Sequence, residues 1–204
     1  MKTTFLAFFL AASGTIFASS LFMSAEVFTN LPSTAGNLDF QFNPGDVTSP
    51  AATATITLFD PAASLNGPAI TGDVSGDLTS SLVINNSTSF NDYFVGYTFP
   101  SEITFQLAFS GPAVDSPTGS GFGSTFFFSL YDAAGVKPLQ TTNADGSGSL
   151  FSIDLLDTGG LVVHDYSADG ASISVGQLPE PGSVGLVLLG LAAICRHRFL
   201  KNSR

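Results

Sequence analysis

The sequence predicts an all-β protein whose central part is an antiparallel β-sandwich of jelly-roll type. Apolar and polar residues alternate with a period of two along several short segments, which directs one face of each strand to a core and the other to water. Turn-forming residues separate these segments at short intervals. No window between the two chain ends has the period of an amphipathic helix. Many short strands with frequent turns are typical of sandwiches and jelly rolls.

The predicted strands follow one another along the middle of the chain, and their order within the sheets is left open. In residues 53–58, Ala54, Ile56 and Leu58 are expected on the core face, with threonines on the other. The expected strands are residues 38–42, 53–58, 102–109, 126–130, 151–155 and 173–175. Gly, Pro, Asn and Asp provide the turns at 44–46, 66–68, 85–86, 111–112, 145–146, 159–160 and 169–170.

Phenylalanine is abundant, with 20 Phe and no Trp in the chain. Most Phe of the predicted strands fall on inward faces, where they would fill a sandwich core. The alternative is a set of rings that stack on sugars, which would need aromatic residues on an outer face. Tyr93, Phe94 and Tyr97 are assigned to neither face, and Gly96 between them indicates a bulge.

The N-terminus is typical of a secretory signal peptide. Lys2 is followed by an apolar stretch from Phe5 to Ala18 and then by small residues. We expect the signal peptide to be residues 1–25, with cleavage after Ala25, and cleavage after Ser20 is the competing site. An uncleaved anchor is the other alternative, but the apolar run is shorter than the ~20 residues of a spanning helix.

The C-terminus combines three features. Leu178-Pro179-Glu180-Pro181 precedes an apolar run over 184–195, and Arg196-His197-Arg198 follows it. This pattern resembles the PEP-CTERM sorting signal of bacterial envelope proteins, although Leu178 stands where Val is commoner and the apolar run is short of ~20 residues. The resemblance implies that an inner-membrane exosortase recognises Pro179, Glu180 and Pro181, that 184–195 is a transient transmembrane helix, and that Arg196 and Arg198 are its cytoplasmic basic stop.

The two terminal signals divide the chain into three parts. These are a signal peptide (1–25), a β-sandwich ectodomain (26–177) and a sorting signal (178–204). The ectodomain resembles an uncharacterised class of such surface proteins, a resemblance that implies no activity. It is carried by two segments, Leu38-Asp39-Phe40-Gln41-Phe42-Asn43 and Gly72-Asp73-Val74-Ser75-Gly76-Asp77-Leu78.

Charge is distributed unevenly between these parts. All 16 acidic residues lie between Glu26 and Glu180, where Lys137 is the only Lys or Arg, so this segment has a formal charge of −15. Such a segment repels nucleic acid and attracts cations. The basic residues beside both apolar ends favour a precursor with both ends in the cytoplasm. The single Cys195 lies in the C-terminal apolar run, so the ectodomain forms no disulfide.

No catalytic signature is present in the sequence. His164 is the one histidine outside the tail, and neither a G-x-S-x-G nor an H-E-x-x-H motif occurs. We therefore expect a non-enzymatic protein. A glycosidase would need two facing carboxylates, for which Asp154 with Asp157, or Asp73 with Asp77, are available.

Two acidic turn segments are candidate binding sites for calcium. Asn143 with Asp145, and Asp73 with Asp77, offer oxygen ligands around a Gly, but neither segment completes an EF-hand loop. The alternative is that these residues form Asx-type turns with solvated acids.

Taken together, these features predict an exported protein of the cell surface or extracellular matrix with a structural or interaction role. It would be sorted by exosortase and anchored transiently in the inner membrane. The alternative is a carbohydrate-binding module for exopolysaccharide, and a glycosidase is a third hypothesis.

Overall fold

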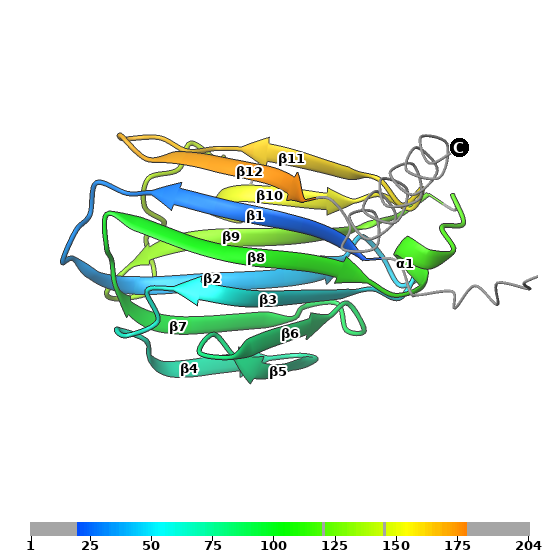
Figure 1. Ribbon diagram of the computed structural model, residues 1–204, viewed down its shortest axis with the longest axis horizontal. Coiled ribbons are helices and arrows are strands. Elements are labelled where there is room, and N and C mark those ends of the chain that lie inside the picture. The colour runs from blue at the N-terminus through cyan, green and yellow to red at the C-terminus, as the bar shows by residue number, and fades with distance from the viewer. Residues whose placement is uncertain (1–19, 120, 145, 179–204) are drawn as a thin grey trace, which may run out of the picture.

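A computed structural model describes residues 20–119, 121–144 and 146–178. Within these residues, two antiparallel six-stranded sheets pack face to face, so the predicted all-β sandwich is confirmed (Figure 1). The strands are β1 (Leu21–Phe28), β2 (Ala35–Pro44), β3 (Thr53–Asp60), β4 (Asn66–Thr71), β5 (Val74–Asp77), β6 (Ser81–Asn85), β7 (Asp92–Thr98), β8 (Glu102–Ser110), β9 (Ser124–Asp132), β10 (Ser149–Leu155), β11 (Leu161–Asp165) and β12 (Ser172–Leu178). One short helix, α1 (Pro112–Asp115), lies in the β8–β9 connection.

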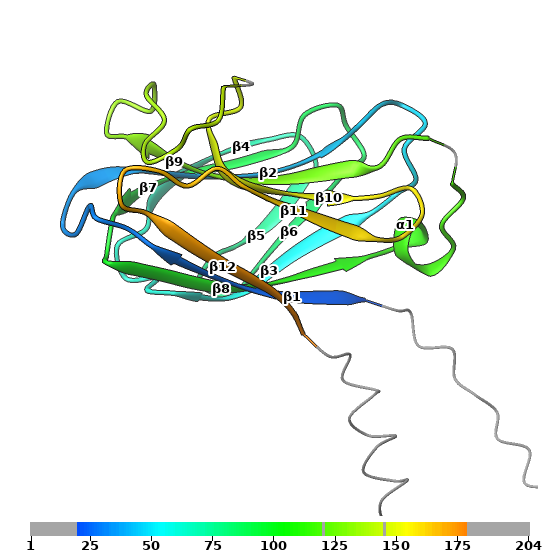
Figure 2. The ribbon, with the colours of Figure 1, turned by 90° about the horizontal axis from the view of Figure 1, so that it is seen from above.

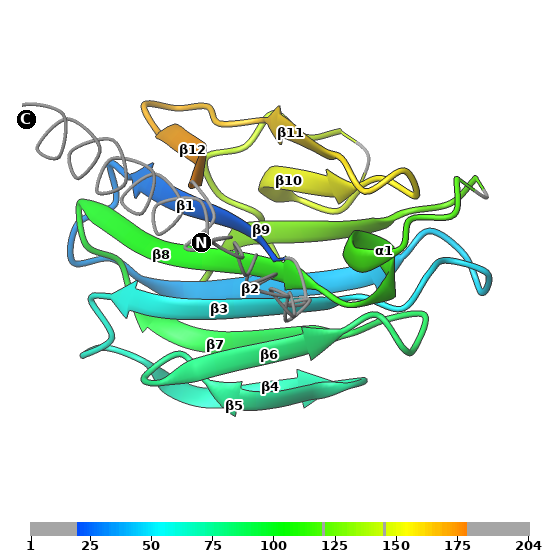
Figure 3. The same ribbon diagram turned by 45° about the vertical axis from the view of Figure 1, so that its right-hand side comes forward.

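The chain passes repeatedly from one sheet to the other. The first sheet has the order β12-β1-β8-β3-β6-β5 and the second has β11-β10-β9-β2-β7-β4. Figure 2 shows the two layers from above, and Figure 3 shows β4 and β5 at one side of the sandwich with β11 and β12 at the other. Most pairings therefore join segments that are far apart in the sequence.

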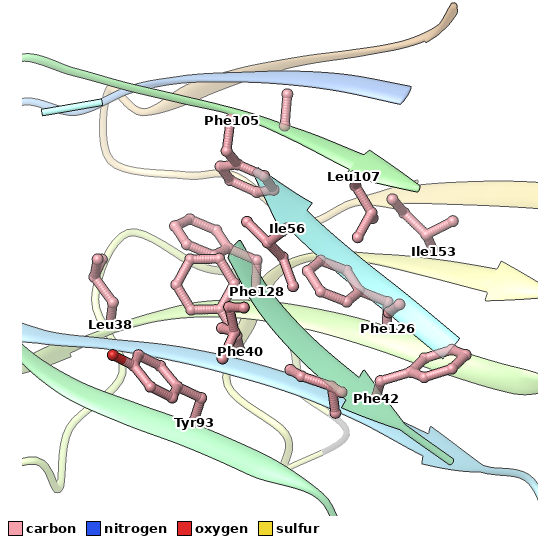
Figure 4. Close-up of a cluster of buried hydrophobic side chains, with 14 of the residues drawn as sticks. Leu38, Phe40, Phe42, Ile56, Tyr93, Phe105, Leu107, Phe126, Phe128 and Ile153 are labelled. Carbon is pink, nitrogen blue, oxygen red and sulfur yellow. The ribbon is translucent and has the colours of Figure 1, made fainter. Parts of the chain in front are cut away.

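Phenylalanine fills the space between the sheets, as predicted. Phe40 on β2 contacts Phe105 on β8 with ring centroids 5.5 Å apart, and Phe128 on β9 with centroids 5.0 Å apart. Figure 4 shows side chains from β2, β3, β8, β9 and β10 pointing toward one another in this cluster. Tyr93 and Tyr97 are also buried in the core, with exposed fractions of 2% and 3%.

All six predicted strands are present, but one inward residue was predicted wrongly. Leu58 was expected on the core face of β3 with Ala54 and Ile56, and it is 69% exposed. The register of β3 against β8 shifts between Thr57 and Asp60, and Leu58 has φ 52°. This bulge turns Leu58 outward and places Phe59, at 7% exposure, in the core instead.

The prediction of a turn at 66–68 was wrong, because these residues form the first half of strand β4. Strand β4 is an exposed edge strand, where a proline is tolerated because no neighbour needs its N–H. A register shift between Asn66 and Ala69 lies opposite Gly96 of β7. A Cβ on Gly96 would lie 2.9 Å from the Asn66 carbonyl oxygen, so this glycine permits a close backbone approach.

Strand β1 begins upstream of the expected start of the ectodomain at residue 26. It lies between β12 and β8 and pairs with both over its length. Met23, Ala25 and Val27 are buried in the core. Phe22 pairs with Leu178, so the described chain begins and ends side by side (Figure 2).

No helix within the described ranges is long and apolar enough to cross a membrane. The predicted membrane segment at 184–195 and most of the predicted signal peptide lie outside those ranges.

Candidate functional site

The outer face of the second sheet carries polar and aromatic side chains from five neighbouring strands. Its residues alternate with core residues such as Leu38, Phe40 and Phe42, so they point away from the core. By strand, this outer face comprises Asn37, Asp39, Gln41 and Asn43 (β2), Asp92 and Phe94 (β7), Thr125, Phe127, Ser129 and Tyr131 (β9), Ser152 and Asp154 (β10), and His164 (β11).

A row of hydrogen bonds runs along β2 on this face. The Asn91 N–H donates to Asn43 Oδ1 at 2.7 Å, and Asn43 Nδ2 donates to Gln41 Oε1 at 3.0 Å. Gln41 Nε2 then donates to Asp39 Oδ2 at 2.8 Å. Side chains two residues apart share a strand face, which is why each amide reaches the next. The row therefore ends on one oxygen of Asp39.

Asp39 and Asp92 form a carboxyl pair at the end of this row. Gln41 is the register partner of Asp92 on β7, so Asp39 lies diagonally across from Asp92. Asp39 is only 3% exposed, and Asp92 is half-buried. Burial raises the pKa of Asp39 to about 8, with further contributions from the hydrogen bond to Asp92 and its charge. Burial also raises the pKa of Asp92.

Aromatic rings flank this pair. The rings of Phe94 and Tyr131 contact each other, with their centroids 5.7 Å apart. Phe127 of β9 is the register partner of Gln41 of β2. Tyr131 is two residues from Ser129, the register partner of Asp39, and lies on the same face. Burial raises the pKa of Tyr131, and the charges of Asp39 and Asp92 raise it further. Of the three aromatic residues that the sequence left unassigned, only Phe94 faces outward.

His164 belongs to a second polar group on the same face. Its Nε2 lies 2.9 Å from Asp154 Oδ2, and Thr125 Oγ1 donates to Asp154 Oδ1 at 2.7 Å. The imidazole stacks on Tyr166 with centroids 6.3 Å apart. Among the described residues, the hydrogen-bond partner of the His164 ring is a carboxylate and not a hydroxyl.

In each of the two carboxylate pairs predicted for a glycosidase, the two side chains have different surroundings. Asp154 binds His164 and Thr125, whereas Asp157 accepts a hydrogen bond from the Gly121 N–H in the β8–β9 connection. Asp73 directly precedes β5 and Asp77 ends it, so their Cα atoms are about 13 Å apart along the extended chain.

Each predicted calcium ligand that the structure describes is held in its own turn. Asp73 accepts hydrogen bonds from Asn85 Nδ2 at 3.2 Å and Ser87 Oγ at 2.6 Å. Asp77 Oδ1 accepts from the Thr79 N–H at 2.8 Å and from its hydroxyl, and these bonds lower the pKa of Asp77. Asn143 Nδ2 donates to Ser147 Oγ and Ser149 Oγ, and Asp145 lies outside the described residues.

No group of three or more His, Cys, Asp or Glu side chains is gathered for a metal in the described part of the chain. The sequence did not single out Asp39, Asp92 or Ser129, because their proximity depends on how three distant strands pair. The one indication in the sequence was that residues 39, 41 and 43, which share a strand face, are all polar.

A pocket of about 440 Å³ opens between the β2–β3 and β6–β7 connections. Asn86 forms part of its wall, and this buried amide donates to the Pro50 carbonyl at 2.8 Å and to Ser124 Oγ at 2.7 Å. Asn86 Oδ1 accepts from the Ala52 N–H at 2.8 Å. Val47 at the pocket is 98% exposed. Its lining contains small, polar and aliphatic residues but no aromatic ring for a sugar to stack on.

The predicted sorting residues Pro179, Glu180, Pro181, Arg196 and Arg198 lie outside the described residues. The chain matches no protein-family model, no curated protein and no solved structure.

Proposed function

We propose that this protein is an exported, non-enzymatic β-sandwich of the cell surface or extracellular matrix, delivered through an exosortase. The observation that supports it best is the position of the two ends of the sandwich. Phe22 of β1 and Leu178 of β12 are register partners, so both terminal signals join the domain at one place. Each signal adjoins the end of a strand, and a cut beyond that end leaves the ladder intact.

The structure favours Ser20 over Ala25 as the site of signal-peptide cleavage. Cleavage after Ala25 would remove residues 21–25, which include the buried Met23 and Ala25. It would also place a charged amino terminus inside a strand that is paired on both sides. Cleavage after Ser20 leaves β1 complete.

The position of the sorting motif fits this proposal. Strand β12 ends at Leu178, and the sequence continues directly with Pro179. Proline lacks an N–H and cannot extend the ladder, so an extended peptide would remain accessible to a processing enzyme. The strand order also supports the jelly-roll class, because β1-β8-β3-β6 facing β2-β7-β4 follows the way a jelly roll winds its strands around two sheets. Strand β5 departs from that order, since it pairs with β6 in the first sheet and not with β4.

The sorting proposal is tested in a bacterium that has an exosortase. The full chain is compared with a variant carrying Pro179→Ala, Glu180→Ala and Pro181→Ala. We expect the variant to accumulate as a precursor in the inner membrane while the parent reaches the surface or medium. Glu26→Gln, which alters one exposed charge, is the matched control. Equal surface delivery of all three proteins would disprove recognition of the motif, and parent protein found only in the cytoplasm would disprove export.

A second candidate function is the binding of an exopolysaccharide on the outer face of the second sheet. Phe94, Phe127 and Tyr131 face outward there beside the amides of Gln41 and Asn43, a combination of rings and hydrogen-bonding groups suited to sugars. A glycan array tests it with Phe127→Ala and, as control, Phe122→Ala at an exposed loop position. Binding that is lost only in Phe127→Ala supports this function, and absence of binding by the parent excludes it.

A further inference from the structure

Three buried side-chain oxygens on the outer face of the second sheet have no hydrogen-bond partner when both carboxyls are ionised. They are Asp39 Oδ1, Asp92 Oδ1 and Ser129 Oγ. The other such atom among the described residues, Gln140 Oε1, belongs to the β9–β10 connection, where the amide nitrogen of Gln140 binds Asn30. A buried polar atom without a partner destabilises the folded state, so three on one face require an explanation.

The three oxygens come from neighbouring strands and share one face. Ser129 of β9 is the register partner of Asp39 of β2, which puts their Cβ atoms roughly 5 Å apart. Asp92 of β7 is diagonal to Asp39 on the other side of β2. Ser129 is fully buried and lies between the core residues Phe128 and Leu130, so its side chain points to the outer face beside Asp39.

A shared proton accounts for only part of this arrangement. One proton between Asp39 and Asp92 would satisfy both carboxyl oxygens, but it would leave Ser129 Oγ without a partner. A cation among the three oxygens would satisfy all of them and would neutralise the two carboxylates without protonation. The ligands are all oxygen, which selects a hard cation, and the −15 charge of the segment from Glu26 to Glu180 attracts one.

We propose that Asp39, Asp92 and Ser129 form a binding site for a divalent cation of the Ca²⁺ type. Asp92 is half-buried, so the ion enters from its side and keeps water ligands there to reach six to eight oxygens. The site links β2, β7 and β9, three adjacent strands of the second sheet. It is distinct from the turns at Asp73, Asp77 and Asn143, and it does not depend on the sorting proposal.

The test uses the full-length chain in mild detergent, freed of metal with a chelator and then titrated with Ca²⁺. We expect the melting temperature to rise with Ca²⁺ concentration and to level off in the way that binding to the folded state requires. Asp39→Asn and Asp92→Asn should each abolish the rise, and Ser129→Ala should weaken the affinity about tenfold or more. Glu26→Gln and Asp77→Asn should respond like the parent.

Terbium provides a second readout that does not depend on stability. Tyr131 lies two residues from Ser129 on the same strand face, so its ring should sensitise the luminescence of Tb³⁺ bound at this site. Tyr131→Phe should reduce that emission strongly while leaving the Ca²⁺-dependent rise in melting temperature. An unchanged melting temperature in the parent would overturn the proposal. So would a response lost in Asp77→Asn and kept in both Asp39→Asn and Asp92→Asn.

Discussion

Phe22 of β1 pairs with Leu178 of β12, so the first and last strands of the sandwich are neighbours in one sheet. Strand β1 also pairs with β8 and therefore connects the edge strand β12 to the rest of the first sheet. The stability of the domain consequently depends on residues that a signal-peptide prediction assigns to the leader.

Removal of residues 1–25 should therefore prevent stable folding, whereas removal of residues 1–20 should not. The longer deletion loses the buried Met23 and Ala25 and most of the β1 ladder, against a total stability of about 5–15 kcal/mol for a domain of this size. Limited proteolysis of chains that begin at Leu21 and at Glu26 measures this. Equal resistance of the two chains would show that β1 is dispensable before Glu26.

Phe40→Ala should destabilise the fold by about 3–5 kcal/mol, because its ring is fully buried between the sheets and contacts Phe105 and Phe128. Phe94→Ala should cost clearly less, since Phe94 lies half-buried on the outer face. Urea unfolding of both variants measures the two changes. Similar losses would contradict the assignment of Phe94 to the outer face.

Asn86→Ala should lower the free energy of unfolding by about 2–3 kcal/mol. The change removes three hydrogen bonds, to Pro50, Ala52 and Ser124, and leaves the Ala52 N–H without its acceptor. Asn66→Ala is the control, because Asn66 is exposed on the edge strand β4. Thermal or urea unfolding measures both variants, and equal effects would show that Asn86 does not fix the β2–β3 connection.

Stability should depend on pH through Asp39 when no cation is present. The pKa of Asp39 is raised from 3.8 to about 8 in the folded protein, chiefly by burial, so between these values the folded state binds more protons than the unfolded state. The contribution of Asp39 is therefore fully present below about pH 4 and is lost as the pH rises through about 8. Asp92 of β7 and Tyr131 of β9 are the titratable groups that face it.

The Asp39→Asn variant replaces this carboxyl with an amide, which does not titrate between about pH 4 and about pH 8. Its stability relative to the parent should rise steadily between about pH 4 and about pH 8, measured by urea unfolding in buffer with a chelator. A constant difference between the two proteins over this range would contradict the raised pKa.

Alternation along the chain predicted the six strands whose inner residues form the aromatic core. The same rule missed β4, β5 and β11, because these exposed strands have no continuous buried face. It also missed β6 and β7, although their residues do alternate between buried and half-buried positions. It missed β1 because an apolar strand after an apolar leader gives the same composition as a longer leader. Leu58 was misplaced because a bulge adds one residue and reverses the alternation that follows it.

The candidate site was less predictable than the fold for a related reason. The three residues of the site, Asp39, Asp92 and Ser129, lie far apart in the sequence. Each one taken alone is an ordinary polar residue on the outer face of a strand. Only the pairing of β2 with both β7 and β9 brings them together. The terminal signals, in contrast, are contiguous in the sequence and need no tertiary structure to be noticed.

The intact mass of the mature protein, recovered from the surface or medium of a bacterium with an exosortase, tests the central claim most directly. The account predicts a chain that begins at Leu21 and ends close to Pro179-Glu180-Pro181, with β1 and β12 both complete. A mature chain that begins at Glu26, or one that retains the C-terminal residues after export, would contradict it.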